Sequence, residues 1–373
     1  MRWIIRIAAV ILGIAVLLPL GLFLAAYIIA SPRPDMIPPG DPQQFAGGSG
    51  SQGNPFELRL ATFNVQLTRV VGRHRAARAR AIAEELRQLD PDVVAFQEAF
   101  VDADVQLLTD LLRKITRLIH HQRYPSSRAG SGLLISSAFP IHKIAFEPYA
   151  DHAPIWRFWE ADGLARKGVA MARLTLPSGV LVDIFNTHVQ AAYSWNRYEE
   201  IRNRQLAQAR LIVEHRTHPS IPAFFLGDIN SGEQSPPFST LTGGGFMERA
   251  MAIPSGIDHI FHVLQQGGSR VEVLYTQRIE KHWEEDGVSL ELSDHPGFFT
   301  IVKVYPGEAR QAISGQEKKP ALTFLRAGPR SDRGLSRAGR TIVAAVRGTA
   351  GKTGPGPPAD TGVSPAGSHP GTG

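Results

Sequence analysis

Four apolar runs in this sequence end in polar side chains of the kinds that bind divalent metals and phosphate esters. The clearest run is Val180 to Phe185, where five of six residues are apolar, and it leads into Asn186, Thr187 and His188. Strands that are distant in sequence can end at the same rim of a sheet sandwich, so we expect these polar residues to meet there. Carboxylates, amides and imidazoles gathered at one rim would suit a divalent metal and a phosphate ester. The other three runs end in Asn64, Glu98 and Asp228-Ile229-Asn230.

Each of these residues also has an ordinary structural explanation. Asn64 alone would usually be a turn residue or a cap, His188 could be a satisfied core histidine, and Asp228 could begin an Asx turn. Glu98 is more informative, because a carboxylate at the end of a buried strand needs a partner and a metal is a good one. The fixed order of the motifs favours chemistry, since unrelated turns and caps would seldom reproduce it. Two later motifs continue that order: Asp258 within Ile-Asp-His-Ile-Phe, and Asp294-His295 within Ser-Asp-His-Pro.

The order of motifs from Leu58 to Lys303 resembles the endonuclease/exonuclease/phosphatase superfamily, the group around pancreatic deoxyribonuclease, inositol-phosphate phosphatases and neutral sphingomyelinases. The resemblance implies an α/β fold, a four-layered sandwich of two packed mixed β-sheets flanked by helices, as in the deoxyribonuclease. It implies Mg²⁺ at Asn64 and Glu98, with Mn²⁺ as a substitute. This sequence departs from the family pattern at Ile229, where Phe or Leu is common, and at His259, where Tyr is usual. The implied catalytic set is His188, Asp228, Asn230, Asp258, Asp294 and His295.

Phosphodiester hydrolysis assigns a role to each member of this set. Water is a poor nucleophile at neutral pH, so a base must accept its proton, and His295 suits this role if Asp258 fixes its tautomer. Charge that builds on the phosphate oxygens needs compensation from Mg²⁺ and from donors such as His188 and Asn230. We expect Asp228 to orient the attacking water. Asp294 would lie beside the metal or support its ligands, and the sequence leaves open whether one metal or two operate.

Within the superfamily, the neutral sphingomyelinases are the most similar subgroup. Thr187 to Ala191 resembles their Thr-His-x-Gln-Ala signature, and the segment after it, with Asn196, resembles their next helix. Asp162 and Lys167 stand at the spacing of an Asp/Lys pair that looks like the subgroup's active-site switch. Their ordinary explanation is a surface ion pair worth little. The resemblance predicts that Lys167 and Asn196 bind substrate, with Lys167 contacting the phosphate.

Several functions remain open at this point. A sphingomyelinase-like phospholipase C would release phosphocholine, or a related head-group phosphate, from a membrane lipid. An exported nuclease would need a basic groove with stacking aromatic residues beside His188. A phosphatase acting on a phosphoinositide or another phospholipid is a close third, and a catalytically silent membrane scaffold is disfavoured because every expected catalytic position is occupied.

The charge distribution argues against nucleic acid as a partner. The chain has 373 residues and a net charge of +6, and the segment from Pro306 to Gly373 holds ten basic residues against four acidic ones. The tail therefore accounts for the whole excess, and the body before it is neutral, whereas a nucleic-acid groove needs basic residues in the folded part. There is no cysteine, which excludes disulfides and thiolate metal sites. We expect a monomer.

The N-terminal segment predicts a membrane anchor. Residues Ile7 to Ala30 carry no charge, and this uncharged segment is long enough to span a bilayer. Arg2 and Arg6 precede it. The positive-inside rule would keep the N-terminus cytoplasmic and place the body on the periplasmic or extracellular side. A cleaved signal sequence is the alternative, but the apolar run exceeds its usual length of about 7–15 residues. The predicted organisation is an anchor over 1–30, a flexible linker over 31–55, a catalytic domain over 56–305 and a disordered basic tail over 306–373.

Periodicity supplies the elements that must position these residues. Helical spacing is expected over 73–89, 105–119 and 196–214, and strands follow one another closely enough to favour mixed sheets over a purely parallel one. The aromatic stretch Ile155 to Trp159 would be a core strand or a surface that dips into a lipid interface. Besides the four runs above, strands are expected over 132–136, 141–146, 169–176, 257–263, 271–275 and 298–304.

Overall fold

The computed structural model describes residues 2–34, 37, 54–69, 71–193, 195, 198–265 and 268–307. Most of the predicted linker over 31–55 and nearly all of the predicted tail over 306–373 lie outside these residues, so both remain predictions. Asn196 also lies outside the described residues, and its predicted role in substrate binding is untested.

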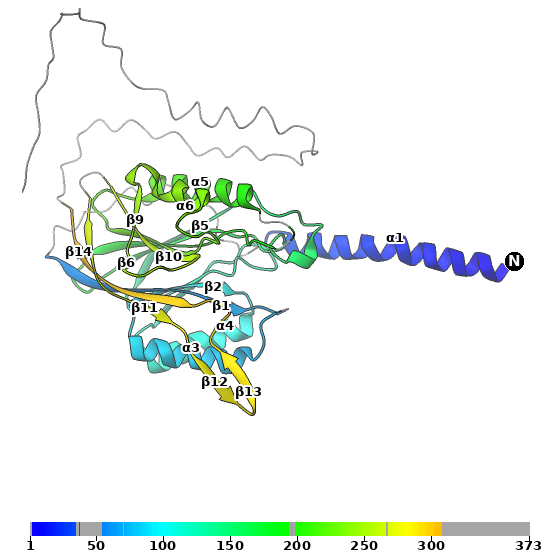
Figure 1. The fold of residues 1–373 in the computed structure, drawn as a ribbon, viewed down its shortest axis with the longest axis horizontal. Coiled ribbons are helices and arrows are strands. Elements are labelled where there is room, and N and C mark those ends of the chain that lie inside the picture. Colours follow the sequence, from blue (N-terminus) through cyan, green and yellow to red (C-terminus); the bar gives the residue numbers. More distant parts are fainter. Residues whose placement is uncertain are drawn as a thin grey trace, which may run out of the picture. The chain divides into compact units, whose positions relative to one another are not determined.

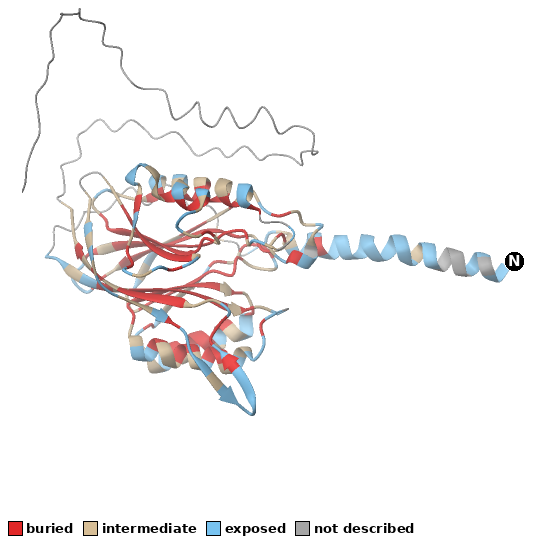
Figure 2. Cartoon of the chain, viewed as in Figure 1, coloured by how far each residue is buried: buried red, intermediate tan, exposed pale blue. Residues whose placement is uncertain are grey.

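The chain begins with one long apolar helix, α1 (Arg2–Ala30). Its stretch Ile11–Ala30 is long and apolar enough to cross a membrane, judged by length and composition. Figure 2 shows most of this helix as exposed, and apolar side chains such as Leu17 and Leu20 have little protein around them. A core helix of a soluble protein would bury these side chains, so their exposure is consistent with the predicted anchor.

Two six-stranded mixed sheets face each other and carry helices on their outer surfaces (Figure 1). Helices α3 and α4 cover the first sheet, and α5 and α6 cover the second. The predicted four-layered α/β sandwich is therefore confirmed. The first sheet has the order β11 (Arg270–Ile279), β14 (Gly297–Tyr305), β1 (Phe56–Leu67), β2 (Val93–Ala99), β4 (Leu134–Ser137) and β3 (His120–Arg123). The second has the order β5 (Ile141–Pro148), β6 (Gly168–Thr175), β7 (Leu181–His188), β8 (Ala223–Asp228), β10 (Asp258–Val263) and β9 (Met247–Arg249). The helices are α3 (Arg75–Leu89), α4 (Asp102–Ile115), α5 (Glu199–Arg216) and α6 (Pro236–Thr242), with short 3₁₀ turns η1 (Phe158–Glu160) and η2 (Gly243–Gly245) and a separate hairpin of β12 (His282–Glu285) and β13 (Val288–Glu291).

Three apolar layers hold the sandwich together. Side chains of a strand alternate between its two faces, so Ile184 of β7 packs between the sheets while Phe185 packs toward α5. In the first sheet, Leu60 of β1 faces the inter-sheet layer and Ala61 faces the helices α3 and α4. Both faces of the central strands are buried, which explains why their sequences are continuous apolar runs rather than alternating ones.

Parallel pairing brings the polar strand ends to one rim. Strand β1 runs parallel to β2, and Asn64 pairs with Gln97 in that register. Strand β7 runs parallel to β8, and His188 pairs with Asp228. Strand β10 is antiparallel to β8, so its first residue, Asp258, also lies opposite Asp228. The strand-end residues of both sheets thus meet at the carboxyl ends of the two parallel pairs.

The helix expected over 105–119 was wrong at its end, because α4 stops at Ile115. Thr116 adopts an extended conformation, and its hydroxyl both donates to the Leu112 carbonyl and accepts from the Leu118 amide. This side-chain turn competes with a further helical turn, so Leu118 is buried in a loop rather than on the helix.

The strand alternative for Ile155 to Trp159 was also wrong. These residues form a turn that leads into η1, and Trp156 and Trp159 are exposed. Periodicity failed here because of two neighbouring residues. Pro154 directly precedes the segment, and Glu160, which directly follows it, hydrogen-bonds to Trp195 and Tyr198 in a later loop. Strand β3, with the sequence His-His-Gln-Arg, and helix α6 were not expected, since neither has a clear apolar period.

Candidate active site

Asp228 is the centre of the rim where the two sheets meet. Its Oδ2 accepts a hydrogen bond from Asn64 Nδ2 at 3.1 Å and lies 3.5 Å from His188 Nε2 and 3.7 Å from His295 Nδ1. Its Oδ1 accepts from the backbone amide of Asn230 at 2.8 Å. Burial, reinforced by the charge of Asp258, raises the pKa of Asp228 to about 7. One carboxylate therefore contacts side chains from three other stretches of the chain.

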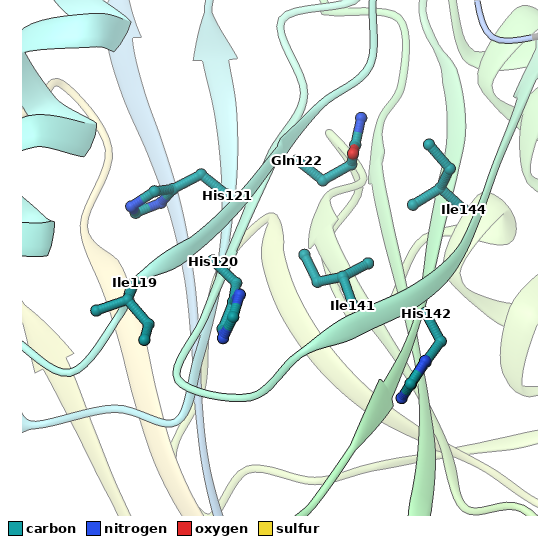
Figure 3. Close-up of a pocket in the computed structure, with 7 residues that line it drawn as sticks. All are labelled: Ile119, His120, His121, Gln122, Ile141, His142 and Ile144. Carbon is teal, nitrogen blue, oxygen red and sulfur yellow. The ribbon is translucent and has the colours of Figure 1, made fainter.

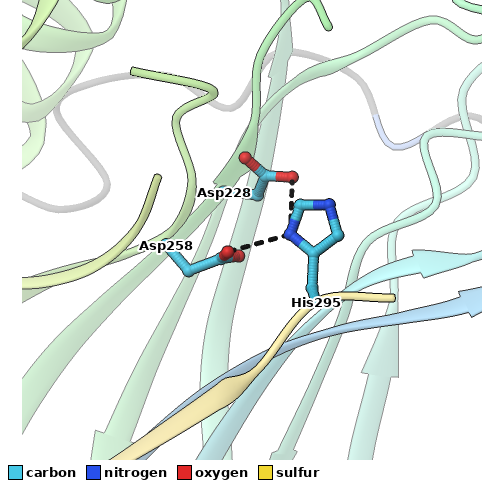
Figure 4. A group of neighbouring side chains, drawn as sticks. All are labelled: Asp228, Asp258 and His295. Atoms are coloured by element: carbon cyan, nitrogen blue, oxygen red, sulfur yellow. Dashed lines mark hydrogen bonds and ion pairs between the residues drawn. The ribbon is translucent and has the colours of Figure 1, made fainter. Parts of the chain in front are cut away.

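His295 is held by two carboxylates (Figure 4). Its Nδ1 hydrogen-bonds to Asp258 Oδ2 at 2.9 Å and lies 3.7 Å from Asp228 Oδ2, and Nε2 lies on the side of the ring away from Asp258. Burial alone would lower the pKa of His295, but the hydrogen bond to Asp258 and the charge of Asp228 outweigh it and raise the pKa to about 10. The hydrogen bond to Asp258 fixes the orientation of the imidazole ring.

Glu98 offers the carboxylate that a divalent cation would require. Burial raises its pKa, and the charges of Asp228 and Asp294 add to that effect, while Lys167 and a hydrogen bond from Asn64 oppose it. The Asn64 amide nitrogen donates to Glu98 Oε1 at 3.2 Å, and its oxygen accepts from the Gln66 backbone amide at 3.2 Å. Oxygen ligands crowded together in this way suit Mg²⁺.

Two details refine the predicted metal site. Asn64 directs its nitrogen, rather than its oxygen, toward Glu98, so it would have to turn its amide to serve as a ligand. Among the described residues, Asp228, Asp258 and His295 form a group whose ligand atoms lie within 4.8 Å of one another. Asn64 links this group to Glu98, so carboxylate oxygens are available on both sides of Asn64.

His188 ends β7 beside a buried lysine. Lys167 Nζ lies 3.0 Å from His188 Nε2 and donates a hydrogen bond to the Val189 carbonyl at 2.8 Å. Burial lowers the pKa of His188 well below its usual value, and the charges of Lys167 and His295 lower it further. His188 is therefore neutral, and its Nε2 faces both the Lys167 ammonium and, at 3.5 Å, Asp228 Oδ2.

Lys167 also forms an ion pair with Asp162 Oδ1 at 2.7 Å. Lys167 is buried, so the alternative of a weak surface ion pair was wrong. The other oxygen of Asp162 accepts from Gln190 Nε2 at 2.8 Å and from the Ala191 amide at 2.6 Å. The Asp/Lys pair and the segment after His188 are thus connected directly, although they are separated in sequence.

Two backbone features deliver these side chains. Gly227, directly before Asp228, has φ +144°, and a Cβ there would lie 2.0 Å from the Thr187 carbonyl oxygen. Only glycine permits β7 and β8 to approach this closely. Glu98 and Asn230 both have positive φ, at 56° and 49°, a conformation that is uncommon for residues other than glycine and typical of constrained sites.

Asp294 lies at the outer edge of the site. Its Oδ2 accepts from Gln66 Nε2 at 2.6 Å, and Ser293 contacts its other oxygen. Gln66 was missed in the sequence, although it follows Asn64 by two residues on β1, a spacing that puts two strand residues on one face. His259, which replaces the family's tyrosine, is buried between the Ser255 hydroxyl and the Ser231 carbonyl and is a core residue.

Buried amides connect the two sheets beneath the site. Gln97 of β2 donates to Asn186 Oδ1 at 2.8 Å, and Asn186 of β7 donates to the Phe96 carbonyl at 2.9 Å and the Leu134 carbonyl at 3.2 Å. These bonds cross the apolar inter-sheet layer and fix the relative position of β2 and β7. They set the distance between the Glu98 side of the site and the His188 side.

A pocket elsewhere on the sandwich contains none of the predicted site residues. It lies between β3 and β5 and is lined by histidines and isoleucines (Figure 3). The ring of His121 is turned to the opposite side of β3 from that of His120 and bonds to the Ser136 hydroxyl. Burial lowers the pKa of His121 to about 4. Ser137, which pairs with His120, also pairs with Val93 at the start of β2, so this pocket lies at the end of the sheet remote from Glu98.

Comparison with known proteins agrees with this geometry. Residues 61–295 match the Endonuclease/Exonuclease/phosphatase family. The chain is 32% identical over 211 residues to the inositol phosphosphingolipids phospholipase C of Schizosaccharomyces pombe, covering 54% of this chain and 48% of that protein. It is 28% identical over 181 residues to sphingomyelin phosphodiesterase 2 of Homo sapiens, covering 47% of this chain and 42% of that protein. The match thus spans about half of the length of these relatives or less.

A solved structure shares the fold. The beta toxin of Staphylococcus aureus, in a variant crystallised with bound magnesium ions, superposes with a TM-score of 0.51 at 18% identity. The superposition covers 67% of this chain and 100% of that chain. At this level of identity the likeness concerns the architecture of the sandwich.

Proposed function

Since the chain belongs to the endonuclease/exonuclease/phosphatase family, we propose that it is a metal-dependent phosphodiester hydrolase, a sphingomyelinase-like phospholipase C that acts on a membrane lipid. The observation that carries this proposal is the convergence on Asp228 of residues from both sheets, with His295 paired to Asp258 and Glu98 joined through Asn64. The likeness to two sphingolipid phosphodiesterases supports this class of substrate over others in the family.

The reaction would be attack of water on the lipid phosphodiester. A water oxygen bonds to phosphorus, the bond from phosphorus to the lipid oxygen breaks, and the lipid alcohol leaves as it gains a proton. With a pKa of about 10, His295 holds a proton at neutral pH, so it would act as the base only after losing that proton, a loss that the charge of a bound cation would favour. Oriented by Asp258, His295 would then accept the water proton at Nε2, and Asp228 would orient that water. His188 and Asn230 would donate hydrogen bonds to phosphate oxygens, and Lys167 would offset their charge.

Glu98 and Asn64 would hold Mg²⁺, with Mn²⁺ as a substitute. When bound, the cation would stabilise charge on the phosphate oxygens. Burial, together with the charges of neighbouring carboxylates, raises the pKa values of Glu98 and Asp228, and a bound cation would favour their ionised forms. Asp294, bonded to Gln66 next to this site, would help to keep the cation's surroundings negative.

The surroundings of the site favour a lipid over nucleic acid. Four carboxylates, Glu98, Asp228, Asp258 and Asp294, outnumber the cationic side chains Lys167 and His295 at the rim. A nucleic-acid groove would instead present a row of basic residues along the phosphate backbone. We propose that α1 anchors the chain, that the catalytic body lies outside the cytoplasm and that the protein acts as a monomer.

A substrate panel tests the proposal. Full-length protein in detergent would be given sphingomyelin, an inositol phosphosphingolipid, DNA, RNA, a phosphoinositide and a simple phosphomonoester, each with Mg²⁺ and with excess chelator. We expect release of phosphocholine or inositol phosphate only with the metal, and at least a 100-fold loss in Glu98→Gln and His295→Asn. His282→Asn, on the exposed hairpin, is the matched control and should keep full activity. Cleavage of DNA or RNA alone would favour the nuclease, and release of inorganic phosphate would favour the phosphatase.

A further inference from the structure

Three tryptophans next to the active site are exposed. Trp156, Trp159 and Trp195 have 52%, 59% and 63% of their surface accessible, and we call this group the aromatic rim. Trp156 and Trp159 meet edge to face with ring centroids 6.0 Å apart. Exposed tryptophans are rare on soluble surfaces and are enriched where proteins meet the head-group region of a membrane.

The aromatic rim is built on a buried carboxylate. Glu160 accepts from Trp195 Nε1 at 2.7 Å and from the Tyr198 hydroxyl at 2.5 Å, and Tyr193 bonds to its backbone carbonyl. The ring of Tyr193 stacks on Trp195 with centroids 5.4 Å apart. These contacts hold Trp195 beside Glu160 while most of its surface stays exposed.

The end of α1 is attached to the neighbouring loop. Arg33 donates from its backbone to the Ser126 carbonyl at 2.8 Å, and Arg128 and Ala129 donate to the carbonyls of Ser31 and Ile29. Pro32 and Ser127 form an isolated antiparallel bridge. Pro32 and Arg33 follow the end of α1 by only two to three residues, and two residues of chain span at most about 7 Å. The end of α1 therefore stays next to this loop.

That loop is in turn bonded to the segment that carries the aromatic rim. Ser127 Oγ donates to the Leu164 carbonyl at 3.0 Å, and the Arg166 amide donates to the Gly130 carbonyl at 3.3 Å. The same segment continues to Lys167, which contacts His188. Hydrogen bonds therefore connect the end of α1, the segment that carries Trp156 and Trp159, and the catalytic centre.

We propose that the aromatic rim inserts into the head-group layer of the same bilayer that holds α1, so that the active site opens toward lipids of that membrane. This rests on the proposed anchoring by α1 and not on the proposed hydrolysis. Arg128 is exposed beside the helix exit, where it can contact lipid phosphates. A body on a long tether would sample both its own membrane and others, whereas attachment at Ser31 to Arg33 keeps the rim at one surface.

The five tryptophans of the chain allow a direct test. Full-length chains that keep a single tryptophan, with Phe at the other four positions, would be reconstituted into phosphatidylcholine vesicles with and without brominated acyl chains, which quench tryptophan at membrane depth. We expect at least a two-fold loss of fluorescence for Trp3 in α1, for Trp159 and for Trp195. Trp283, on the hairpin strand β12 and bonded to Glu285, is the matched control and should keep its fluorescence.

Two outcomes would overturn the proposal: quenching of Trp159 and Trp195 no greater than that of Trp283, or no quenching of Trp3. A second measurement avoids the multiple substitutions. In the otherwise natural chain, Trp159→Phe with Trp195→Phe should remove most of the quenchable fluorescence outside α1, and Trp283→Phe should remove none. Quenching needs no turnover, so a chain that docks but hydrolyses none of the lipids tested would contradict the proposed function and leave this inference standing.

Discussion

The proposed reaction depends on single residues, and the role of Asp258 in orienting His295 can be tested most directly. If Asp258 fixes the imidazole, Asp258→Asn should lower kcat for the preferred phosphodiester by about 10²–10⁴-fold, the range that general acid–base catalysis supplies. The substitution also removes a charge that raises the pKa of His295, so the pH–rate profile should shift toward lower pH. Asp110→Asn, on the exposed face of α4, is the control. A variant that keeps half of the natural activity would contradict the assigned role.

His259 should make stability depend on pH without taking part in catalysis. Burial lowers its pKa from 6.5 to about 4, so the folded state prefers the neutral form. The stabilisation is complete above pH 6.5 and is lost as the pH falls toward 4, by up to about 3 kcal/mol. Denaturant titrations at pH 7, 6 and 5 should therefore give a shallower pH dependence of the unfolding free energy in His259→Gln than in the natural chain. Equal slopes would show that another group is responsible.

At this scale the sequence was informative where strands end. Asn64, Glu98, His188 and Asp228 could be predicted to meet, because each follows an apolar run that had to be a buried strand. Gln66 shares a strand face with Asn64, but its partner Asp294 and the partners of Glu160 could not be predicted, because they lie in loops whose course depends on tertiary contacts. The amide orientation of Asn64 was equally beyond prediction, because two hydrogen-bonding choices compete within the site.

Elements determine how closely these residues approach, and the junction of β7 and β8 is the critical one. Gly227→Ala would place a methyl group 2.0 Å from the Thr187 carbonyl oxygen at a φ of +144°. We expect a loss of about 2–4 kcal/mol in unfolding free energy and loss of activity, since both His188 and Asp228 would be displaced. Gly232→Ala, whose Cβ would meet only Gly256 at 3.6 Å, should cost less than about 1 kcal/mol. Similar melting curves for the two variants would contradict this account.

Elements with a clear period were predicted and those without one were not. Helix α3 ends at Leu89 as expected. It begins at Arg75, two residues after the predicted start, because His74 before it adopts a left-handed conformation. Strand β3 is mostly polar and half-buried at a sheet edge, so no alternation marks it. The turn at Trp156 and Trp159 was hidden for the opposite reason, since bulky apolar residues usually indicate a core strand.

At the scale of the whole molecule, the proposed anchor α1 would determine where the protein is located. Leu17→Arg together with Leu20→Arg would add about 2.5–3.5 kcal/mol per residue to the free energy of insertion. We expect the double variant to move from the membrane pellet to the supernatant after alkaline carbonate extraction. Leu211→Arg, at an exposed position of α5, should remain in the pellet. Extraction of the natural chain itself would refute the anchor and favour a cleaved signal sequence.

The two sheets contribute unlike halves of the catalytic apparatus. Asn64 and Glu98 belong to the first sheet, His188 and Asp228 to the second, and Gln97 with Asn186 fastens one to the other. The proposed mechanism needs both halves, so we expect neither half to turn over substrate by itself. After dilution from denaturant, catalytic activity should consequently recover more slowly than the circular dichroism signal. The difference between the two recovery times would measure how long the two sheets take to pack against each other.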